Sequence, residues 1–434
     1  MLLLELLKAL PFYTPINLNE KLLVNDIQIN HRNVKEGDVF ICIKGFTVDG
    51  HQFAESAVHN GAKVIVSEKK IEFNDATTIV VPDTSRALAL LATKFFENPT
   101  SKLQLVGVTG TNGKTTTTYL IERICQEHDR KTGLIGTIQM KIGHKSYPIH
   151  NTTPDALHLQ RSFRQMVEEN VDVAVMEVSS HALDLGRVYG CDFDIAVFTN
   201  LSQDHLDYHK DMNDYLRAKS LLFSRLGNTY DNKRKFAIIN IDDRSSDFIK
   251  KNTAQHIMTY GIDEYADVTA ENIQFHISGT SFTLKTPLGN INIQSKLMGK
   301  FNVYNMLAAT CAAIALNIPL DVIKKALDNI QGVDGRFEQV NEGQDFAVIV
   351  DYAHTPDSLE NVLQTIQGFK KGKVYCIVGS GGDRDRSKRP LMARVATKLS
   401  DFAIFTSDNP RTEDPMQILN DMIEGLKETN YQEI

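Results

Sequence analysis

Short apolar runs rich in β-branched residues recur along the chain and alternate with helical patterns. Three such runs follow one another at residues 171–178, 193–199 and 235–240. Runs that are largely apolar, rather than alternating with polar residues, are typical of parallel strands buried on both faces of a sheet. The pattern therefore predicts an α/β protein with a parallel sheet in its central part.

A different pattern occupies residues 267–295. Apolar and polar residues alternate there in three short runs, at residues 273–277, 281–285 and 291–293. Alternation of this kind indicates strands with one buried face, and the glycines between the runs are typical of tight turns. We expect an antiparallel insertion at this point of the chain.

Similar α/β patterns flank the central block on both sides. One hydrophobic core rarely serves 434 residues, so two or three domains are expected. A Pro-Thr-Ser segment at residues 99–101 is a plausible linker. The strand-like runs of the flanking blocks lie at residues 38–43, 62–67 and 78–81, with a helical pattern at 84–96, and at residues 346–350, 373–378 and 401–405. We predict three domains, at residues 1–100, 101–330 and 331–434.

The N-terminus is apolar, with leucines at helical spacing at positions 3, 6, 7 and 10. Glu5 and Lys8 interrupt this run and no cleavage site follows, so the pattern favours a core helix over a signal peptide. No later segment is long and apolar enough to span a bilayer. We expect no membrane association.

Composition narrows the class of protein. The net charge of −7 and the lack of a basic block argue against nucleic-acid binding. The five cysteines are scattered and none has Cys-x-x-Cys spacing, which favours a reducing cytoplasm without disulfides or a cysteine zinc site.

A glycine-rich segment at residues 107–117 follows an apolar run and precedes a helical pattern. Glycines let several backbone N–H groups point at one anion, and the start of a helix adds a favourable dipole. Lys114 would reach the terminal phosphates and Thr115 would bind Mg²⁺. The spacing departs by one residue from the usual phosphate-loop consensus, because the first glycine is Gly107. We predict that this segment binds a nucleoside triphosphate.

Polar residues follow two of the central strands. Glu177 lies near the end of the run at 171–178, where an acid that holds Mg²⁺ belongs, although an ion pair with a lysine is the alternative. After the next strand, the segment 199–209 includes Asn200, Asp204, His205 and His209. Because Mg²⁺ prefers oxygen ligands, His205 would be an unusual ligand or would act by hydrogen bonding.

Three polar segments follow the strands of the third block, at residues 351–359, 379–390 and 408–415. We expect them to point from one sheet edge, where ligands bind in such folds. Local positive charge there would attract phosphate or carboxylate, although a solvated charge run is the alternative for residues 386–389. The basic residues concerned are Arg384, Arg386, Lys388, Arg389 and Arg411.

Taken in order, these motifs give the chain a resemblance to the Mur ligases, and most closely to their MurE branch. The motifs are the phosphate loop, Asn151-Thr-Thr-Pro154, Glu177-Val-Ser-Ser-His181, residues 200–209, Gly335-Arg-Phe-Glu338, residues 351–359 and Asp408-Asn-Pro-Arg411. The resemblance implies three α/β domains: an N-terminal domain that binds the UDP substrate, a central P-loop ATPase domain and a C-terminal Rossmann-like domain that binds the amino acid.

The resemblance also implies the activity. Such an enzyme is a monomer of the cytoplasm that uses ATP and Mg²⁺ in peptidoglycan synthesis. It phosphorylates a carboxylate of the UDP-N-acetylmuramoyl dipeptide, and the amine of an amino acid then attacks the acyl phosphate.

The resemblance carries roles to individual positions. For ATP they are Gly110, Thr111, Asn112, Gly113, Lys114, Thr115, Thr116, Asn200, Arg336 and Asp351. For catalysis and metal binding they are Lys114, Thr115, Glu177, His205 and Lys219, the last as a carbamate, although by sequence alone Lys219 is a helix-surface lysine. For the UDP-dipeptide they are Arg32, Asn151, Thr152, Thr153, Ser179 and Arg187. For the amino acid they are Arg384, Asp408, Asn409 and Arg411.

The amino acid implied by Asp408-Asn-Pro-Arg411 is meso-diaminopimelate. It differs from lysine by one distal carboxylate, for which the Arg411 guanidinium offers two parallel hydrogen bonds. In a site for lysine, that arginine would be left unpaired at a cost. A lysine-adding enzyme remains an alternative, as do a folylpolyglutamate-synthase-like ligase and a nucleotide-binding fragment without ligase activity.

Two departures from the family pattern bear on these expectations. The uridine-binding region carries Asn30-His31-Arg32 where the family usually has Asp-Ser-Arg. The family's Gly-x-Gly-His-Glu segment is absent from the 434 residues, so we expect a C-terminal domain that lacks its last elements.

Overall fold

The protein is described here by a computed structural model that covers residues 1–45, 48–149, 151–228, 234–276 and 278–426. The chain divides into two compact units. The first unit comprises residues 1–105, 131–174 and 181–193, and the second comprises residues 106–130, 175–180 and 194–434. The division into three domains remains a prediction. Residues 427–434, at the end of the third predicted domain, lie outside the described ranges.

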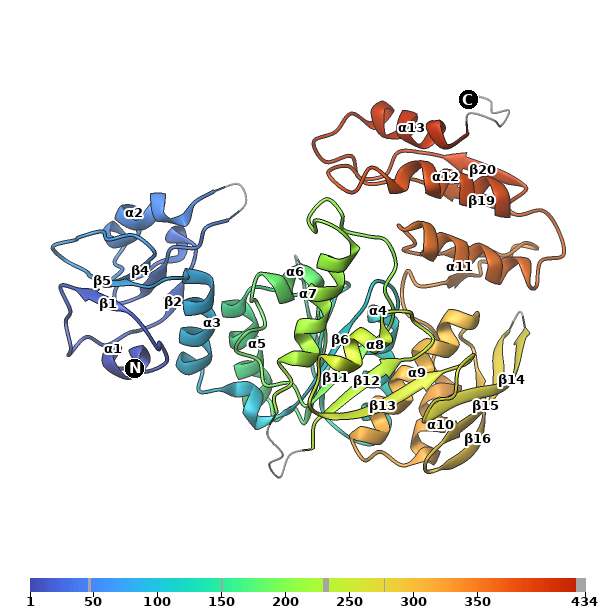
Figure 1. Ribbon diagram of the computed structural model, residues 1–434, viewed down its shortest axis with the longest axis horizontal. Helices are drawn as coiled ribbons and strands as arrows, with labels where there is room; N and C mark the ends of the chain where they lie inside the picture. Colours follow the sequence, from blue (N-terminus) through green and yellow to red (C-terminus); the bar gives the residue numbers. More distant parts are fainter. Residues whose placement is uncertain (46–47, 150, 229–233, 277, 427–434) are drawn as a thin grey trace. The chain divides into compact units, whose positions relative to one another are not determined.

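The first unit begins with a five-stranded sheet in the order β1-β5-β4-β3-β2 (Figure 1). Strands β2 to β5 are parallel where they pair, and β1 is antiparallel to β5. The predicted strands at 38–43, 62–67 and 78–81 and the helix at 84–96 are confirmed. The elements are α1 (Leu3–Leu7), β1 (Thr14–Ile16), β2 (Ile27–Gln28), β3 (Val39–Ile41), α2 (Ala54–His59), β4 (Val64–Ser67), β5 (Thr77–Val80) and α3 (Thr84–Phe95).

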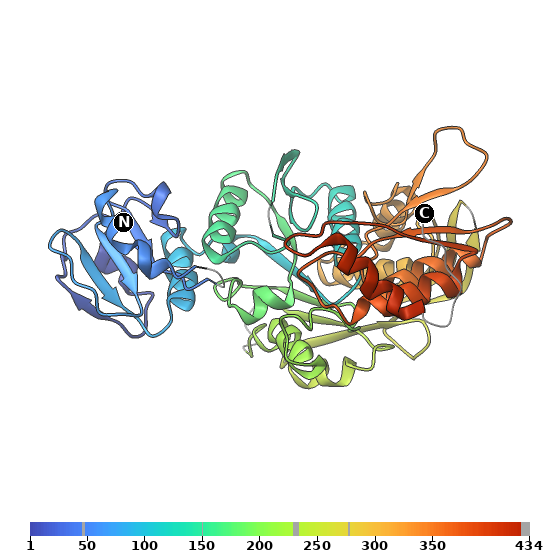
Figure 2. The ribbon, with the colours of Figure 1, turned by 90° about the horizontal axis from the view of Figure 1, so that it is seen from above.

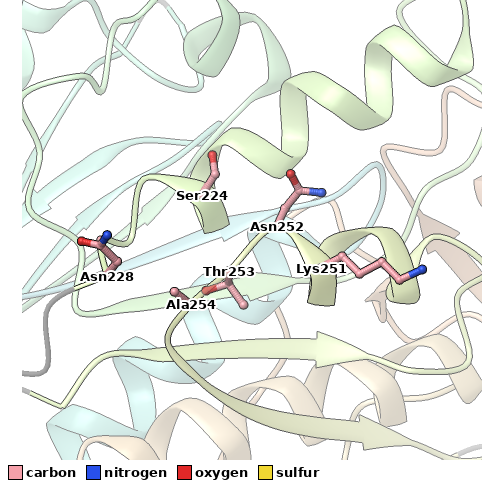
Figure 3. Close-up of a pocket in the computed structure, with 7 residues that line it drawn as sticks. Ser224, Asn228, Lys251, Asn252, Thr253 and Ala254 are labelled. Carbon is pink, nitrogen blue, oxygen red and sulfur yellow. The ribbon is translucent and has the colours of Figure 1, made fainter.

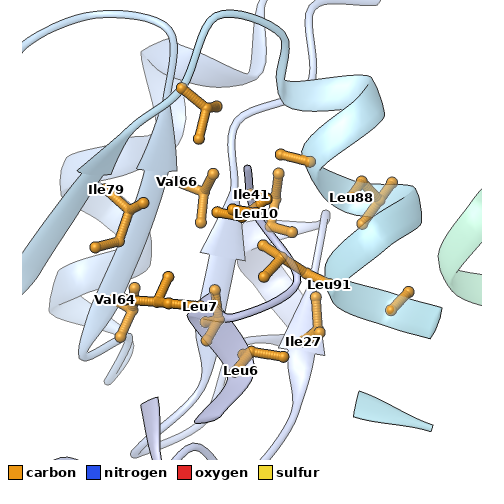
Figure 4. Packing of buried hydrophobic residues seen from close by; sticks show 14 of the residues in the cluster. Leu6, Leu7, Leu10, Ile27, Ile41, Val64, Val66, Ile79, Leu88 and Leu91 are labelled. Atoms are coloured by element: carbon orange, nitrogen blue, oxygen red, sulfur yellow. The ribbon is translucent and has the colours of Figure 1, made fainter. Parts of the chain in front are cut away.

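The predicted N-terminal leucine face is buried in the core of this sheet. Leu6 and Leu7 of α1 and the following Leu10 lie among Ile41 and Leu88, together with other aliphatic side chains of the strands and of α3 (Figure 4). The expectation of a core helix is therefore confirmed. Burying each such side chain contributes about 1.5–3 kcal/mol.

The rest of the first unit contains β7 (Thr132–Ile135), β8 (Met140–Ile142) and β9 (Lys145–Tyr147), which form an antiparallel meander. Helix α5 (Ala156–Glu168) begins after Asp155, whose carboxylate caps it by accepting a hydrogen bond from the His158 N–H. The short helix α6 (Ser180–Asp184) follows strand β10 (Val173–Glu177). Single 3₁₀ turns occur at His31–Asn33, Gly50–Phe53, Pro99–Lys102 and, in the second unit, Glu424–Leu426.

The second unit is built on a sheet with the strand order β16-β15-β14-β13-β12-β11-β6-β10. Strand β11 is parallel to both β6 and β12, and β12 is parallel to β13. Residues of β10 and β11 are buried throughout, so the predicted parallel sheet is confirmed. The strands are β6 (Gln104–Thr109), β10 (Val173–Glu177), β11 (Ile195–Phe198), β12 (Phe236–Asn240) and β13 (His256–Gly261).

The predicted antiparallel insertion is confirmed by β14 (Val268–His276), β15 (Gly279–Thr286) and β16 (Gly289–Ser295). These strands are longer than the predicted runs, and residue 277 lies outside the described ranges. Helix α9 packs on α4 and on the strands β12 and β13. The helices of this part are α4 (Lys114–Glu127), α7 (Met212–Ser224), α8 (Ser246–Lys251), α9 (Lys300–Ala315) and α10 (Leu320–Asn329).

The third block of the chain, from residue 331, holds two small sheets. The prediction that its three polar segments leave one sheet edge is wrong for the first of them. Strand β18 (Val348–Val350) is short and pairs antiparallel with β17 (Glu338–Val340), whereas β19 (Tyr375–Val378) and β20 (Phe402–Phe405) form a separate parallel pair.

Helices α11 (Pro356–Gln367), α12 (Lys388–Leu399) and α13 (Pro415–Ile423) pack beside one another in this block (Figure 2). Their apolar side chains form a core with one face of β19 and β20. Within the described ranges, no helix is both long enough and apolar enough to cross a lipid bilayer.

Candidate active site

The glycine-rich segment forms a tight loop between β6 and α4, as predicted. Gly110 and Gly113 have φ angles of +147° and +84°. A Cβ atom on Gly110 would lie 1.8 Å from Thr199 Oγ1, and one on Gly113 would lie 2.4 Å from Asn305 Oδ1. Both the backbone conformation and the close packing therefore require glycine at these two positions.

The loop is held by the segment that follows β11. Thr199 Oγ1 donates to the Asn112 carbonyl oxygen at 2.7 Å. Asn200 Oδ1 accepts from the Asn112 N–H at 2.9 Å, and Asn200 Nδ2 donates to the same residue's carbonyl at 3.1 Å. Thr111 Oγ1 accepts from the Ser202 N–H at 3.0 Å. The structure thus brings together Thr111, Asn112 and Asn200, which sequence analysis assigned to ATP.

Two asparagines on α9 support the other side of the loop. Thr117 Oγ1 donates to Asn305 Oδ1 at 3.3 Å, and Asn305 Nδ2 donates to Asn302 Oδ1 at 3.0 Å. Both side chains are buried in a helix that is otherwise largely apolar. Sequence analysis missed this pair, although two asparagines three residues apart in an apolar helix are a recognisable signal.

Two lysines, one half-buried and one buried, donate to one carbonyl oxygen of the loop. Lys114 Nζ lies 3.0 Å and Lys219 Nζ 2.7 Å from the Gly110 oxygen. Lys219 is 1% exposed, so its interpretation as a helix-surface lysine is wrong: α7 turns it inward. Burial and the Lys114 charge lower the pKa of Lys219 well below its usual value, although Asp204 opposes the shift. Burial also lowers the pKa of Lys114, against the charges of Glu177 and Asp204.

Asp204 is the carboxylate around which further charged groups gather. It is 3% exposed, and its oxygens lie 3.4 Å from His205 Nε2, 3.4 Å from His354 Nε2 and 3.3 Å from Lys388 Nζ. Burial alone would raise the pKa of this carboxyl, but the hydrogen bond with His354 and the charges of His205 and Lys388 hold it well below its usual range. Sequence analysis noted Asp204 but assigned it no role.

Protein side chains would supply only some of the ligands that Mg²⁺ needs at the predicted site. Glu177 is buried at the end of β10, and its charge acts on Lys114, whose ammonium donates to the phosphate loop. Across the described part of the chain, no group of three or more His, Cys, Asp or Glu side chains could hold a metal ion. Mg²⁺ often uses one or two carboxylates together with substrate phosphates, so the donor chemistry of Thr115 and Glu177 fits this ion.

Arg336 connects the third block to the start of α4, and Asp351 supports the segment that carries this arginine. Arg336 Nη2 donates to Thr115 Oγ1 at 3.0 Å, and its guanidinium lies over the Tyr352 ring at 4.5 Å from the centroid. Asp351 Oδ2 accepts from the Phe337 N–H at 2.7 Å. Burial raises the pKa of the Asp351 carboxyl, although this hydrogen bond opposes the shift. Thr116 is buried in the first turn of α4.

The two loops predicted to bind the amino acid lie together. The Gly382 N–H donates to the Asn409 carbonyl at 2.9 Å, and Arg411 Nη1 donates to the Gly382 carbonyl. Arg384 Nη1 donates to its neighbour's carbonyl, and Asp408 lies close to Gly379. Arg384, Asp408, Asn409 and Arg411 therefore belong to one pair of loops.

The structure changes the interpretation of two other arginines. Arg386 makes two hydrogen bonds of 2.9 Å to the Asp421 carboxylate. Arg389 is 1% exposed and bonds to both Glu413 and Asp421. For Arg389, the alternative of a solvated charge run is wrong, because its side chain is buried. The expectation that it attracts a ligand is also wrong, because Asp421 of α13 and Glu413 before that helix already pair with its guanidinium.

The residues predicted to bind the UDP-dipeptide lie in the first unit, except Ser179, which belongs to the second. Arg187 Nη1 donates to the Thr153 carbonyl at 2.9 Å, and the Thr152 and Thr137 hydroxyls lie 3.1 Å apart. Asn151 is exposed beside them in sequence. Arg32 lies on a 3₁₀ turn, and its N–H donates to the capping Asn30 Oδ1 at 3.0 Å.

A surface pocket of about 550 Å³ lies away from all these residues (Figure 3). It is lined by Ser224 at the end of α7, by Gly227 and Asn228 after that helix, and by residues 251–254 at the end of α8 and just beyond it. None of the predicted site residues lines it, so it supplies no further part of the candidate site.

Comparison with known proteins bears on the whole chain. It matches three family models: Mur ligase family, catalytic domain, over residues 24–96; Mur ligase middle domain, over residues 108–313; and Mur ligase, glutamate ligase domain, over residues 335–434. All three belong to one family and occur in chain order.

Individual relatives agree. The chain is 58% identical over 424 residues to the UDP-N-acetylmuramoyl-L-alanyl-D-glutamate–2,6-diaminopimelate ligase of Oceanobacillus iheyensis, covering 97% of this chain and 86% of that protein. It is 56% identical over 412 residues to the enzyme of the same name from Bacillus cereus, with coverage of 95% and 84%. A solved structure with that name matches with a TM-score of 0.74 at 33% identity, over 98% of this chain and 87% of the other. The chain belongs to the Mur ligase family.

Proposed function

We propose that the protein joins meso-2,6-diaminopimelate to UDP-N-acetylmuramoyl-L-alanyl-D-glutamate with the hydrolysis of ATP to ADP and phosphate, as a step of peptidoglycan synthesis. Mur ligases are ATP-dependent ligases that form an amide bond, and the relatives named for this reaction match nearly the whole chain. The observation in the structure that carries the proposal is the convergence of Lys114, Lys219 and Arg336 on one phosphate loop.

The phosphate loop performs the first step. The backbone N–H groups at the start of α4 and the Lys114 ammonium bind the triphosphate and stabilise the charge that develops as its terminal phosphoryl group moves to a carboxylate of the dipeptide. Arg336, which donates to Thr115 and stacks on Tyr352, is held at the same place and adds positive charge. The carboxylate becomes an acyl phosphate, and phosphate replaces oxide as the leaving group.

Magnesium would be held by Thr115 and Glu177, with His205 as a further candidate residue, and would screen the negative charges of the two substrates. Lys219 is the residue we propose to be carbamylated. Its burial next to the Lys114 cation favours a neutral amine, which is the form that attacks CO₂. The new N–C bond forms as one N–H proton leaves, and the product is an anion that suits the positive surroundings.

The second step is attack by an amine on the acyl phosphate. The paired loops at residues 379–386 and 408–412 carry the groups proposed to bind diaminopimelate. Arg411 has a φ of +49°, and its backbone N–H donates to Asn409 Oδ1 at 3.2 Å. These two features fix the backbone from which the Arg411 side chain extends. A planar guanidinium can bind the distal carboxylate with two hydrogen bonds, which lysine as a substrate would lack.

The test is substrate-dependent turnover of the full chain. We expect ADP and amide product to form only when ATP, UDP-dipeptide and diaminopimelate are all present, and L-lysine to replace diaminopimelate poorly. Arg411→Ala should reduce kcat/KM for diaminopimelate by at least about 100-fold, since it leaves a carboxylate unpaired, while the dissociation constant for ATP changes less than about threefold. Equal losses for both substrates would exclude this role for Arg411, and ATP binding without amide product would exclude ligase activity.

The UDP-dipeptide is proposed to bind at Asn151, Thr152, Thr153 and Arg187, with Arg32 at the uridine and Ser179 at the peptide. The hydrogen bond from Arg187 to the Thr153 carbonyl supports a common role for Arg187 and the segment 151–153. We propose that the enzyme acts as a monomer in the cytoplasm, where its nucleotide substrates are found.

A further inference from the structure

A buried contact joins the third block to the nucleotide-binding part of the second unit. Asp204 lies in the segment after β11, beside His205. Lys388 begins α12, four residues after Arg384, and is 4% exposed. Their charged atoms lie 3.3 Å apart, and both residues belong to the second unit.

Polar contacts next to this pair join the same two segments. Gln203 Nε2 donates to Ser387 Oγ at 3.0 Å and to Asp385 Oδ2 at 3.4 Å. Asp385 Oδ1 in turn accepts from the Ser387 N–H at 2.9 Å, which fixes the turn that leads into α12. The segment that carries Arg384 is therefore tied to residues 203–204 by an ion pair and by hydrogen bonds from the Gln203 amide.

Stability alone does not explain a buried ion pair. Removing two charges from water costs free energy that their attraction only partly returns, so an apolar pair of similar volume is often equally stable. A charged pair does fix the relative position of the segments that carry it, because each charge left alone in the interior is strongly unfavourable. Asp204 also acts electrostatically on Lys114, which follows the phosphate loop, and on Lys219 of α7.

We infer that the Asp204–Lys388 pair is a positioning contact that docks the diaminopimelate-binding segment, residues 379–388, onto the nucleotide-binding loop. The inference rests on the proposed function. Docking brings the bound amine to the acyl phosphate, so the pair matters for the second step and little for the first. When Lys388 is lost, Asp204 keeps His205 and His354 as partners, and the charges around Lys114 remain.

The test separates the two steps in the full chain. Formation of the acyl phosphate is measured without diaminopimelate, by trapping it with hydroxylamine as a hydroxamate in the presence of ATP and UDP-dipeptide. Amide formation is measured with diaminopimelate. For Lys388→Met we expect hydroxamate formation within about threefold of the unmodified enzyme and a fall in kcat/KM for diaminopimelate of at least about 30-fold.

Lys398→Met is the matched control, because Lys398 lies on the same helix and is exposed. Its rates should equal those of the unmodified enzyme. Gln203→Ala is a milder second variant that removes the amide hydrogen bonds and leaves the ion pair in place. We expect a loss of about threefold in kcat/KM for diaminopimelate, with hydroxamate formation unchanged. If Lys388→Met fails to fold, this variant decides the question.

A double-mutant cycle with Asp204→Asn tests the pair itself. The loss in kcat/KM for diaminopimelate in Asp204→Asn/Lys388→Met should be no larger than in the worse single variant. Additive losses, equal losses in both steps, or normal amide formation by Lys388→Met and Gln203→Ala would overturn the inference. An unmodified enzyme that makes hydroxamate and amide in no condition would instead overturn the proposed function.

Discussion

Replacing Arg389 by methionine should destabilise the protein without changing its substrate use. The Arg389 guanidinium donates to Glu413 at 2.8 and 2.9 Å, to Asp421 at 2.7 Å and to the Gly381 carbonyl at 3.2 Å. Methionine fills much of the same volume but removes all four hydrogen bonds. Because these contacts assign Arg389 a structural role, the variant should change stability and leave ligand binding unchanged.

The magnitude follows from the partners left behind. Breaking a fully buried pair by removing one partner costs about 3–5 kcal/mol. The Glu413 and Asp421 side chains retain 20% and 14% of their exposure, and Asp421 keeps its two hydrogen bonds from Arg386. We therefore expect about 2 kcal/mol, which corresponds to a fall in Tm of roughly 4–8 °C for a unit of this size.

The assay is thermal unfolding of the full chain followed by circular dichroism, together with steady-state kinetics at a temperature where the variant is folded. Lys398→Met, an exposed position on the same helix, should leave Tm unchanged. KM for ATP and for diaminopimelate should stay within about twofold of the unmodified enzyme. An unchanged Tm combined with a large rise in either KM would refute the structural assignment of Arg389.

Three further outcomes are expected. Gly110→Ala should weaken ATP binding in calorimetric titrations by at least about 100-fold, because the new Cβ atom would clash with Thr199. Gly343→Ala should leave ATP binding unchanged, because Gly343 also has a positive φ but no atom lies near its Cβ position. Equal effects of the two substitutions would contradict the packing argument. Asn305→Leu should raise the ATP dissociation constant about tenfold by leaving Thr117 without its acceptor, and unchanged affinity would exclude that support. The pKa values of Glu413 and Asp421, about 2 in the folded state, lie below their unfolded values near 4. The stability they contribute is therefore present above about pH 4 and lost as pH falls towards 2, and acid titrations should show a weaker pH dependence in this window once Arg389 is replaced by methionine.

The strands and the phosphate loop could be predicted because their signals are local. Apolar runs of β-branched residues identified β10, β11 and β12, and alternation identified the antiparallel insertion. The phosphate loop was recognised from glycines placed between a strand and a helix. In each case the residues that carry the signal are close in sequence to the structure that they form.

The roles of the charged residues could not be predicted in the same way. Whether Lys219 faces solvent or the Gly110 carbonyl depends on how α7 packs, and α7 lies about a hundred residues from the loop. Arg389 is buried because Glu413 and Asp421 meet it from a later segment. Strand β18 was assigned to the wrong sheet because an apolar run does not specify its partner. Each error concerns a contact between segments that are distant in sequence.

The cations at the phosphate loop also suggest why this site suits a triphosphate. The Lys114 ammonium donates to the Gly110 carbonyl oxygen, and Arg336 donates to the neighbouring Thr115. Desolvation lowers the pKa of Lys114, which means that holding its charge there costs the protein free energy when no anion is bound. A phosphate chain carries the opposite charge and needs several fixed donors, so its binding would offset that cost. Positive charge held in advance requires little reorganisation when a phosphoryl group is transferred, and the same feature that destabilises the loop therefore favours the reaction proposed for it.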